Sequence, residues 1–271
     1  MRPPAVAGQF YEGDREGLIA QIENCYLHKV GPGRLPQLRD GKRTLRGLVC
    51  PHAGYVYSGP VAAHSYAALA EDGLPETFVV LGPNHTGLGA AVALGTQDFQ
   101  TPLGVAEVDQ ELARQLLKDV LYEDMAAHRF EHSIEVQLPF IQHLREKVKF
   151  VPICLMDQEL GTAKKVGQII REAIGGKDVV IVASTDFSHY VPKDVAAKKD
   201  RMAIDQILKM DARGLYQTIE KNDITMCGYG PVIAMMTAAE GGKATLLKYA
   251  SSGDVAPMRE VVGYGSVAVR A

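Results

Sequence analysis

The sequence predicts an α/β protein of three layers, in which helices cover both faces of a central mixed, mostly parallel sheet. Short apolar runs rich in β-branched residues predict buried strands. Longer amphipathic or Ala-rich stretches lie between these runs and predict helices. Strands that alternate with such helices form βαβ units and hence parallel sheets. The last strands have less helix between them, so we expect part of the sheet to be antiparallel.

The first elements follow from local residue chemistry. Turn formers at residues 31–36 are expected to join a first helix to the first strand. That strand is the apolar run 45–50, and the Ala-rich stretch 58–71 predicts the next helix. Residues 77–81 are β-branched, aromatic and apolar and lie between a proline and a glycine, which is typical of a buried strand.

The later elements continue this alternation. The stretch 134–147 predicts a helix in which Pro139 causes a kink or a late start, because proline lacks the N–H that an interior turn needs. Further helices are expected over residues 109–118, 160–174, 192–210, 212–222 and 230–240. Further strands are expected over residues 149–155, 178–183, 245–249 and 261–269.

Length and composition are those of an ordinary globular chain. Its 271 residues suit a single α/β domain over 1–271, with 46% apolar and 23% charged residues. A chain of this length buries enough surface to fold without a disulfide or a metal ion. We therefore expect any bound metal to serve function rather than folding.

Charge and hydropathy exclude several classes of function. Net charge is −3, and Lys and Arg gather only in short pieces, so the electrostatic footprint of a nucleic-acid-binding protein is absent. No apolar stretch is long enough to span a membrane, and the first residues lack the apolar core of a signal peptide. Four scattered cysteines without a C-x-x-C pair indicate reduced thiols, and we expect a cytoplasmic protein.

Three histidines follow predicted buried strands. His52, His85 and His189 each come within a few residues of a strand end. Ligands of open α/β sheets bind beyond the carboxyl ends of the strands, so parallel strands would gather these imidazoles at one edge. Proline and glycine beside His52 and His85 fix the loops, which suits metal coordination. Asp186 lies three residues before His189 and is a candidate to orient an imidazole or a water.

A single histidine after a strand is usually a hydrogen-bonded loop residue, and only the shared position of three favours a site. The remaining histidines lack this placement. His132 and Glu135 form an H-x-x-E pattern that places both side chains on one helical face, as a pocket wall or a substrate contact. The others are expected to be surface or packing residues: His28, His64, His128 and His143.

Cys227 lies in a turn-rich segment that opens a predicted helix. A thiol near a helix N-terminus tends toward the thiolate, which is a soft metal ligand or a nucleophile. A buried free thiol is the structural alternative. Cys25, Cys50 and Cys154 lie on apolar faces or inside a strand and are expected to be packing residues.

Several segments together resemble the Memo family, in the right order and over nearly the whole chain. These segments are 3–11 (PPAVAGQFY), 51–59 (PHAGYVYSG), 82–85 (GPNH), 131–135 (EHSIE), 184–190 (STDFSHY) and 227–231 (CGYGP). The family is similar in fold to class III extradiol dioxygenases, which are non-haem Fe(II) enzymes with two histidines and one carboxylate as ligands. Prokaryotic members are often associated with AMMECR1-like and radical-SAM proteins.

The resemblance implies roles for individual residues. His52 and His85 match the two histidine ligands, and His189 matches the acid/base histidine of the dioxygenases. Cys227 stands where those enzymes use a Glu, and a His₂Cys set favours Cu, Zn or a differently tuned Fe. We therefore expect one transition-metal ion, Fe or Cu with Zn as a further option. Substrate contacts are assigned to His132, Glu135, Tyr55, Asn84 and Tyr190.

Three functions remain open from the sequence. The first is a metal-dependent redox or oxygenase-like protein in which His189 and Asp186 move a proton. The second is a non-catalytic module that retains the pocket, binds a peptide or a small metabolite, and works with an AMMECR1-like or radical-SAM partner. The third is a metal-free cysteine hydrolase with Cys227 as nucleophile, His189 as base and Asp186 as its orienting residue.

Overall fold

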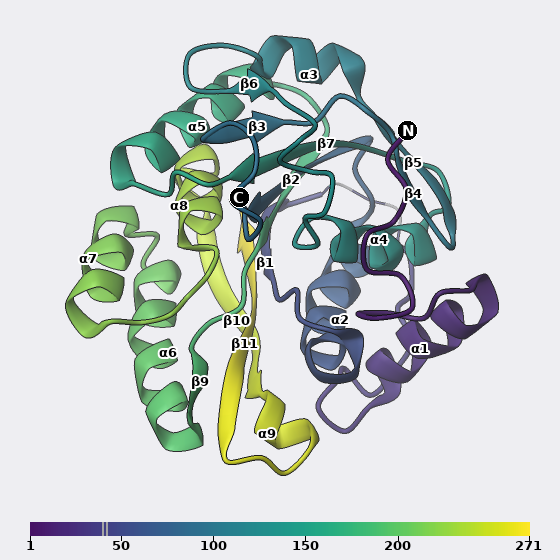
Figure 1. Cartoon of the computed structure of the whole chain (residues 1–271), viewed down its shortest axis with the longest axis vertical. Coiled ribbons are helices and arrows are strands. Elements are labelled where there is room, and N and C mark those ends of the chain that lie inside the picture. Colours follow the sequence, from purple (N-terminus) through teal and green to yellow (C-terminus); the bar gives the residue numbers. More distant parts are fainter. Residues whose placement is uncertain (40, 42) are drawn as a thin grey trace.

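The chain forms a central mixed sheet with helices packed on both of its faces (Figure 1). This computed structural model describes residues 1–39, 41 and 43–271. Its architecture confirms the three-layer α/β fold. The described strands are β1 (Leu45–Cys50), β2 (Thr77–Pro83), β3 (Val92–Leu94), β4 (Phe99–Thr101), β5 (Gly104–Val108), β6 (Tyr122–Glu123), β7 (Val148–Leu155), β8 (Val179–Ser184), β9 (His189–Pro192), β10 (Lys243–Ser251) and β11 (Glu260–Arg270).

The sheet has a parallel centre and largely antiparallel flanks. Its main order is β10-β11-β1-β8-β2-β7-β3-β6. β1, β8, β2 and β7 are mutually parallel, whereas β11 pairs antiparallel with β1, β10 and β9. β3 also meets β7 antiparallel. The predicted mixed sheet is confirmed, with parallel strands at its centre and antiparallel pairing of the last strands. The antiparallel contact between β3 and β7 at the other edge was not predicted.

The helices form two layers. One layer consists of α1 (Arg15–Leu27), α2 (Tyr55–Asp72) and α4 (Leu138–Leu144), which contact one another. The other contains α3 (Gln110–Leu116), α5 (Leu160–Ala173), α6 (Lys193–Leu208), α7 (Ala212–Asn222) and α8 (Tyr229–Ala238). Both layers are visible on opposite sides of the sheet in Figure 1. A 3₁₀ turn, η1 (Glu135–Gln137), precedes α4, and a short helix, α9 (Ser252–Val255), precedes β11.

The central strands are buried on both faces. Every residue of β2 and of β8 is buried, because each strand lies between the two helical layers. Cys25, Cys50 and Cys154 belong to the main core, as expected for packing residues. None of the described helices combines the length and apolar character needed to cross a membrane.

The differences from the sequence prediction have local causes. α2 begins at Tyr55 rather than 58, directly after Gly54. The helix expected over 134–147 begins late, since Pro139 occupies the first turn of α4, where its missing N–H has no cost. β3 to β6, β9 and α9 were not predicted, because elements of two to five residues show no periodicity.

Candidate metal centre

Three neighbouring parallel strands deliver polar residues to one edge of the sheet. In the strand register, Cys50 at the end of β1 lies opposite Ser184 at the end of β8. β2 ends level with them, since its Leu81 pairs with Ala183. The chain continues from these strand ends to His52, Asp186 and His85. The topological argument from the sequence therefore brings His52 and His85 together, as the ring centroids lie 5.2 Å apart.

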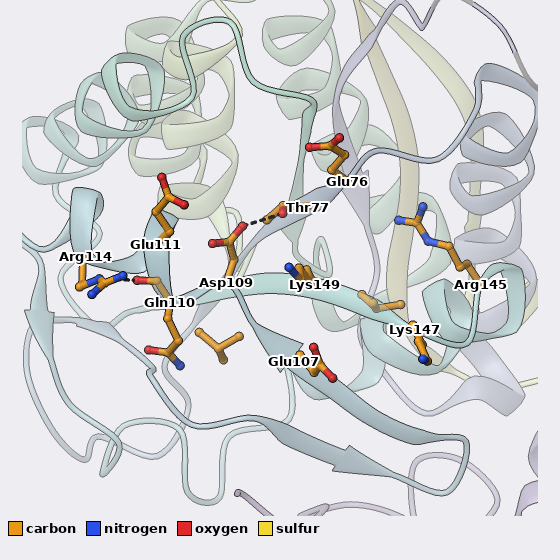
Figure 2. A pocket seen from close by; sticks show the side chains of 12 residues that line it. Glu76, Thr77, Glu107, Asp109, Gln110, Glu111, Arg114, Arg145, Lys147 and Lys149 are labelled. Carbon is orange, nitrogen blue, oxygen red and sulfur yellow. Dashed lines mark hydrogen bonds between the residues drawn. The ribbon is translucent and has the colours of Figure 1, made fainter.

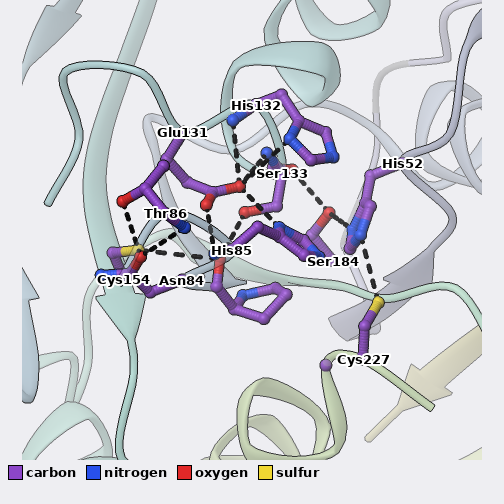
Figure 3. A network of polar contacts seen from close by, with 12 residues as sticks. His52, Asn84, His85, Thr86, Glu131, His132, Ser133, Cys154, Ser184 and Cys227 are labelled. Carbon is purple, nitrogen blue, oxygen red and sulfur yellow. Dashed lines mark hydrogen bonds and ion pairs between the residues drawn. The ribbon is translucent and has the colours of Figure 1, made fainter. Parts of the chain in front are cut away.

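A third imidazole completes this cluster. Candidate ligand atoms of His52, His85 and His132 all lie within 4.8 Å of one another (Figure 3). The His132 ring is stacked on His85 at 4.6 Å and lies 5.4 Å from His52. His132 reaches the site from the segment before η1, where we had expected a pocket wall or substrate contact. Three converging imidazole nitrogens form a donor set suited to Zn, Cu or Fe.

The carboxylate of Glu131 holds two of these histidines. Its Oε1 lies 2.9 Å from His85 Nδ1 and accepts from the backbone N–H of His132 at 2.9 Å and of Ser133 at 2.8 Å. Its Oε2 accepts from the His85 N–H at 2.5 Å. His132 Nδ1 lies 3.5 Å from the same Oε1. Because an ionised carboxylate only accepts, His85 carries its hydrogen on Nδ1 and leaves Nε2 free for a ligand.

His52 has the same tautomer for a different reason. Its Nδ1 lies 2.9 Å from Ser184 Oγ. That hydroxyl donates its single hydrogen to the Ser133 carbonyl and accepts from Gln137 Nε2. It therefore accepts from His52 Nδ1–H, and His52 Nε2 keeps its lone pair. Tyr66 donates to Gln137 Oε1 and so fixes which way the amide faces.

Electrostatics keep His52 and His132 in the protonation state that metal binding would require. Burial lowers the pKa of His52 well below its ordinary value and lowers the pKa of His132 to about 4, so both imidazoles are neutral near pH 7. Burial alone would raise the pKa of Glu131, but the hydrogen bonds that its carboxylate accepts from His85 and from the Ser133 N–H outweigh burial and lower that pKa to about 2. Neutral imidazoles beside an ionised carboxylate are the arrangement that supports metal ligation.

Cys227 lies beside His52. Its Sγ is 3.2 Å from His52 Nε2 and accepts from the Asp186 N–H at 3.3 Å. Gln158 fixes the Cys227 loop by bonding the Cys227 carbonyl and the Gly230 N–H. Burial raises the pKa of the free thiol, so a cation is needed to favour the thiolate. The sulfur adjoins His52 but is not part of the three-histidine group.

Asp186 and His189 occupy different positions around the cluster. The Asp186 carboxylate accepts from the His52 N–H at 2.8 Å and is buried, and this burial raises its pKa to about 6. His189 is the first residue of β9, and its side chain is more exposed to solvent than that of Asp186. Its Nδ1 lies 2.8 Å from the Thr225 carbonyl, which leaves Nε2 free. The imidazole that contacts Cys227 is His52, so the geometry does not provide the Cys227–His189 pair that a cysteine hydrolase would need.

A family model described as Memo-like protein matches residues 2–268 of the chain. The chain belongs to the Memo family. It is 50% identical to a MEMO1 family protein of Methanopyrus kandleri over 99% of both chains. It is also 47% identical to a MEMO1 family protein of Methanothermobacter thermautotrophicus, over 97% of this chain and 98% of the relative. These full-length matches confirm the resemblance drawn from the sequence motifs.

A solved structure supports the fold of this Memo-family chain. An uncharacterized protein from Escherichia coli K12 superposes with a TM-score of 0.59 at 14% sequence identity. The match covers 83% of the present chain and 99% of the other. At this identity the likeness concerns the fold alone.

The residues assigned to substrate contact lie in several places. Asn84 shapes the His85 loop, since its Oδ1 accepts from the backbone of residues 86 and 87 and its amide donates to the Leu88 carbonyl. Tyr190 is 73% exposed and adjoins His189. Tyr55 is buried, and its hydroxyl donates to the Val136 carbonyl. Glu135 is also buried, with both oxygens bonded to the segment 2–11. The polar atoms of Tyr55 and Glu135 are therefore bonded within the protein, and their assignment to substrate contact stays a prediction.

Three hydrogen-bond partners of the histidine cluster were not assigned from the sequence: Glu131, Ser184 and Gln137. Glu131 stands beside His132 in the EHSIE motif, so its position was visible although its role was not. Gln137 reaches the Ser184 hydroxyl from a separate segment of the chain. Such long-range contacts have no signature in local spacing.

A large hollow lies elsewhere in the structure. It measures about 930 Å³ and is lined by side chains of both charges, among them Glu76, Lys149 and Arg145 (Figure 2). Thr77 begins β2 and Val148 begins β7 there, so the hollow opens at the amino ends of strands whose carboxyl ends face the histidines. It lacks histidine and cysteine in its lining and is separate from the candidate metal centre.

Glu131→Gln should weaken metal binding by about 10–100-fold. The amide nitrogen of Gln cannot accept a hydrogen bond, so the contacts that one carboxylate oxygen makes with His85 or the His132 backbone would be lost. A competition titration with Zn²⁺ measures this change in Kd. Glu123→Gln, on the exposed strand β6, is the matched control. An unchanged Kd for Glu131→Gln would show that this carboxylate does not hold the ligands.

His128 provides a prediction on pH. Burial lowers its pKa to about 4 from an ordinary 6.5, and its Nε2 lies 3.1 Å from the Ala93 carbonyl. As pH falls, the unfolded chain therefore takes up this proton first. The contribution of neutral His128 to the free energy of unfolding is therefore full above pH 6.5. It decreases by up to about 3 kcal/mol as the pH falls toward 4.

His128→Gln should remove this pH dependence while keeping a donor for the Ala93 carbonyl. Urea unfolding of both proteins at neutral pH and near pH 4 measures the difference. The free energy of unfolding should fall more steeply in the wild type. Parallel loss in both proteins would mean that His128 is not held neutral.

Proposed function

We propose that this Memo-family protein binds one transition-metal ion at His52, His85, His132 and Cys227 and uses it in redox or oxygenase-like chemistry. One observation carries the proposal. Three imidazoles direct nitrogens to a common region within 4.8 Å, and the opposite nitrogens of His52 and His85 are held by hydrogen bonds. If His52 and His85 only packed in the core, there would be no need for separate hydrogen bonds at each Nδ1 that both leave Nε2 free.

The position of Cys227 supports its assignment as a ligand together with His52 and His85. Tetrahedral bonds of roughly 2.0 Å to nitrogen and 2.3 Å to sulfur place the two donor atoms about 3.5 Å apart. The Sγ–Nε2 separation of 3.2 Å is within a few tenths of an ångström of this value. The Asp186 N–H that points at Sγ would stabilise a thiolate further.

The donor chemistry bears on the choice of metal. Imidazole ligands suit Fe, Cu and Zn alike, and a thiolate shifts the preference toward the softer Cu and Zn or a differently tuned Fe. We propose Fe or Cu as the resident ion, with Zn also compatible. When bound, the ion would supply redox and Lewis-acid chemistry at the pocket.

His189 is the proposed proton carrier of the site. Its Nδ1 is engaged by the Thr225 carbonyl, its Nε2 is free, and its side chain is partly accessible. Imidazole is the side chain best suited to exchange protons near neutral pH. Asp186 assists by holding the main chain of His52 and by placing a negative charge near His189. Exposed Tyr190 flanks His189 and is proposed to contact the substrate.

Exposed apolar side chains favour a second candidate function. Leu88, Phe130 and Tyr190 are 45%, 57% and 73% exposed and belong to the segments that carry His85, His132 and His189, respectively. Such side chains suit the docking of a peptide or a protein. The candidate is a non-catalytic module that works with an AMMECR1-like or radical-SAM partner. Partner binding that survives removal of all metal would favour this candidate over the redox function.

The ligand assignment is tested by purifying the wild type and three variants without oxygen and measuring bound Fe, Cu and Zn. The variants are His85→Ala, His132→Ala and Cys227→Ser. We expect near one ion per wild-type chain, its loss from His85→Ala, and weaker retention in the other two. Cys227→Ser should also lose the thiolate-to-metal absorption.

The matched control is His64→Asn, whose half-buried imidazole contacts the Val30 carbonyl away from the cluster. It should keep wild-type metal content. Wild-type protein that takes up none of the three metals would overturn the proposal. Full occupancy and an unchanged spectrum in Cys227→Ser would remove the thiolate from the ligand set.

A further inference from the structure

The Arg2 guanidinium bonds to several points of the segment that carries His132. This side chain is 3% exposed and lies more than a hundred residues from its partners in the sequence. Its Nε donates to the His128 carbonyl at 2.7 Å, and its Nη2 donates to the Glu131 carbonyl at 2.6 Å. Its Nη1 forms an ion pair with the Glu135 carboxylate. One guanidinium therefore connects three points of the segment 128–135.

The Glu135 carboxylate forms further hydrogen bonds with the segment 2–11. It accepts from the backbone N–H groups of Ala5 and Val6 at 2.8 and 3.1 Å, and from the Tyr11 hydroxyl at 2.5 Å. The Phe10 ring then lies 4.7 Å from the His132 ring. The two segments thus form one buried polar unit with an aromatic contact on a proposed metal ligand.

A buried ion pair is a poor source of stability, because the loss of hydration offsets most of the attraction. It does, however, fix geometry when every donor and acceptor is used. Arg2 uses all three of its nitrogens, and the flat guanidinium holds its acceptors in fixed directions. Two of those acceptors are carbonyls on either side of the Glu131 side chain.

We infer that Arg2 is a positioning residue of the metal centre, which acts by fixing the backbone from which Glu131 and His132 project. Phe10 supports the same arrangement by packing on the His132 ring. This inference rests on the proposed metal function, but it concerns a different part of the chain. It explains why the segment 2–11, which provides no candidate ligand, is joined so closely to the His132 segment.

Two variants test the inference with Co²⁺ alone as an optical probe. Arg2→Ala removes both hydrogen bonds to carbonyls and the ion pair with Glu135. Arg2→Lys keeps the charge but cannot reach three acceptors at once. Both should weaken Co²⁺ binding by about 10–100-fold, in the range seen when partners of metal ligands are removed. Their visible ligand-field spectra should also change. The control is Ile170→Ala, a buried core substitution in α5 of the other helical layer.

A double-mutant cycle separates positioning from general destabilisation. If Arg2 acts through His132, Arg2→Ala should have a much smaller effect on the Co²⁺ Kd in a His132→Ala background. Additive losses would overturn the inference. So would a loss in Ile170→Ala that equals the loss in Arg2→Ala at a similar fall in Tm.

Hydrogen exchange of the metal-free protein provides a readout that does not depend on metal binding. Amides of residues 128–135 should exchange faster in Arg2→Ala than in Ile170→Ala, while the central strands behave alike in the two proteins. Unchanged exchange there would overturn the inference. If the wild type binds no Co²⁺, the metal proposal fails, and the exchange result still decides whether Arg2 holds this segment.

Discussion

The arrangement of the candidate site depends on one carboxylate. Glu131 gathers the N–H of His85, its Nδ1 and the backbone of His132 onto two oxygens. These contacts join the loop after β2 to the segment before η1, which are separate in the chain. They therefore hold the stacked rings of His85 and His132 on one common support.

The part of the site that depends on strand order could be predicted from the sequence. Buried apolar runs identified β1, β2 and β8, and their parallel pairing predicted that His52, His85 and His189 lie at one edge of the sheet. The structure brings His52 and His85 together there. The edge of the sheet beyond β7 was harder to predict, because β3 to β6 are too short for a periodic pattern. β3 pairs antiparallel with β7 and β5 pairs parallel with it, while β6 pairs with β3 and β4 with β5.

The part that depends on contacts between distant segments could not be predicted. His132 appeared in the sequence as half of an H-x-x-E pair, yet its partner Glu135 turns inward to Arg2. His132 lies before the 3₁₀ turn η1, and Glu135 is its first residue. Because the two residues do not share a regular α-helix, the spacing rule for helical faces does not apply. Only the folded chain shows that Glu131, and not Glu135, is the carboxylate of the cluster.

The central claim is that hydrogen bonds at Nδ1 leave Nε2 of His52 and His85 as the metal ligands. Anomalous diffraction from crystals grown with Zn²⁺ tests it most directly, because it locates the ion relative to both ring nitrogens. The account predicts a single strong peak at bonding distance from Nε2 of both residues, with Glu131 still bonded to His85 Nδ1. An ion bound through Nδ1, or a peak remote from both imidazoles, would contradict it.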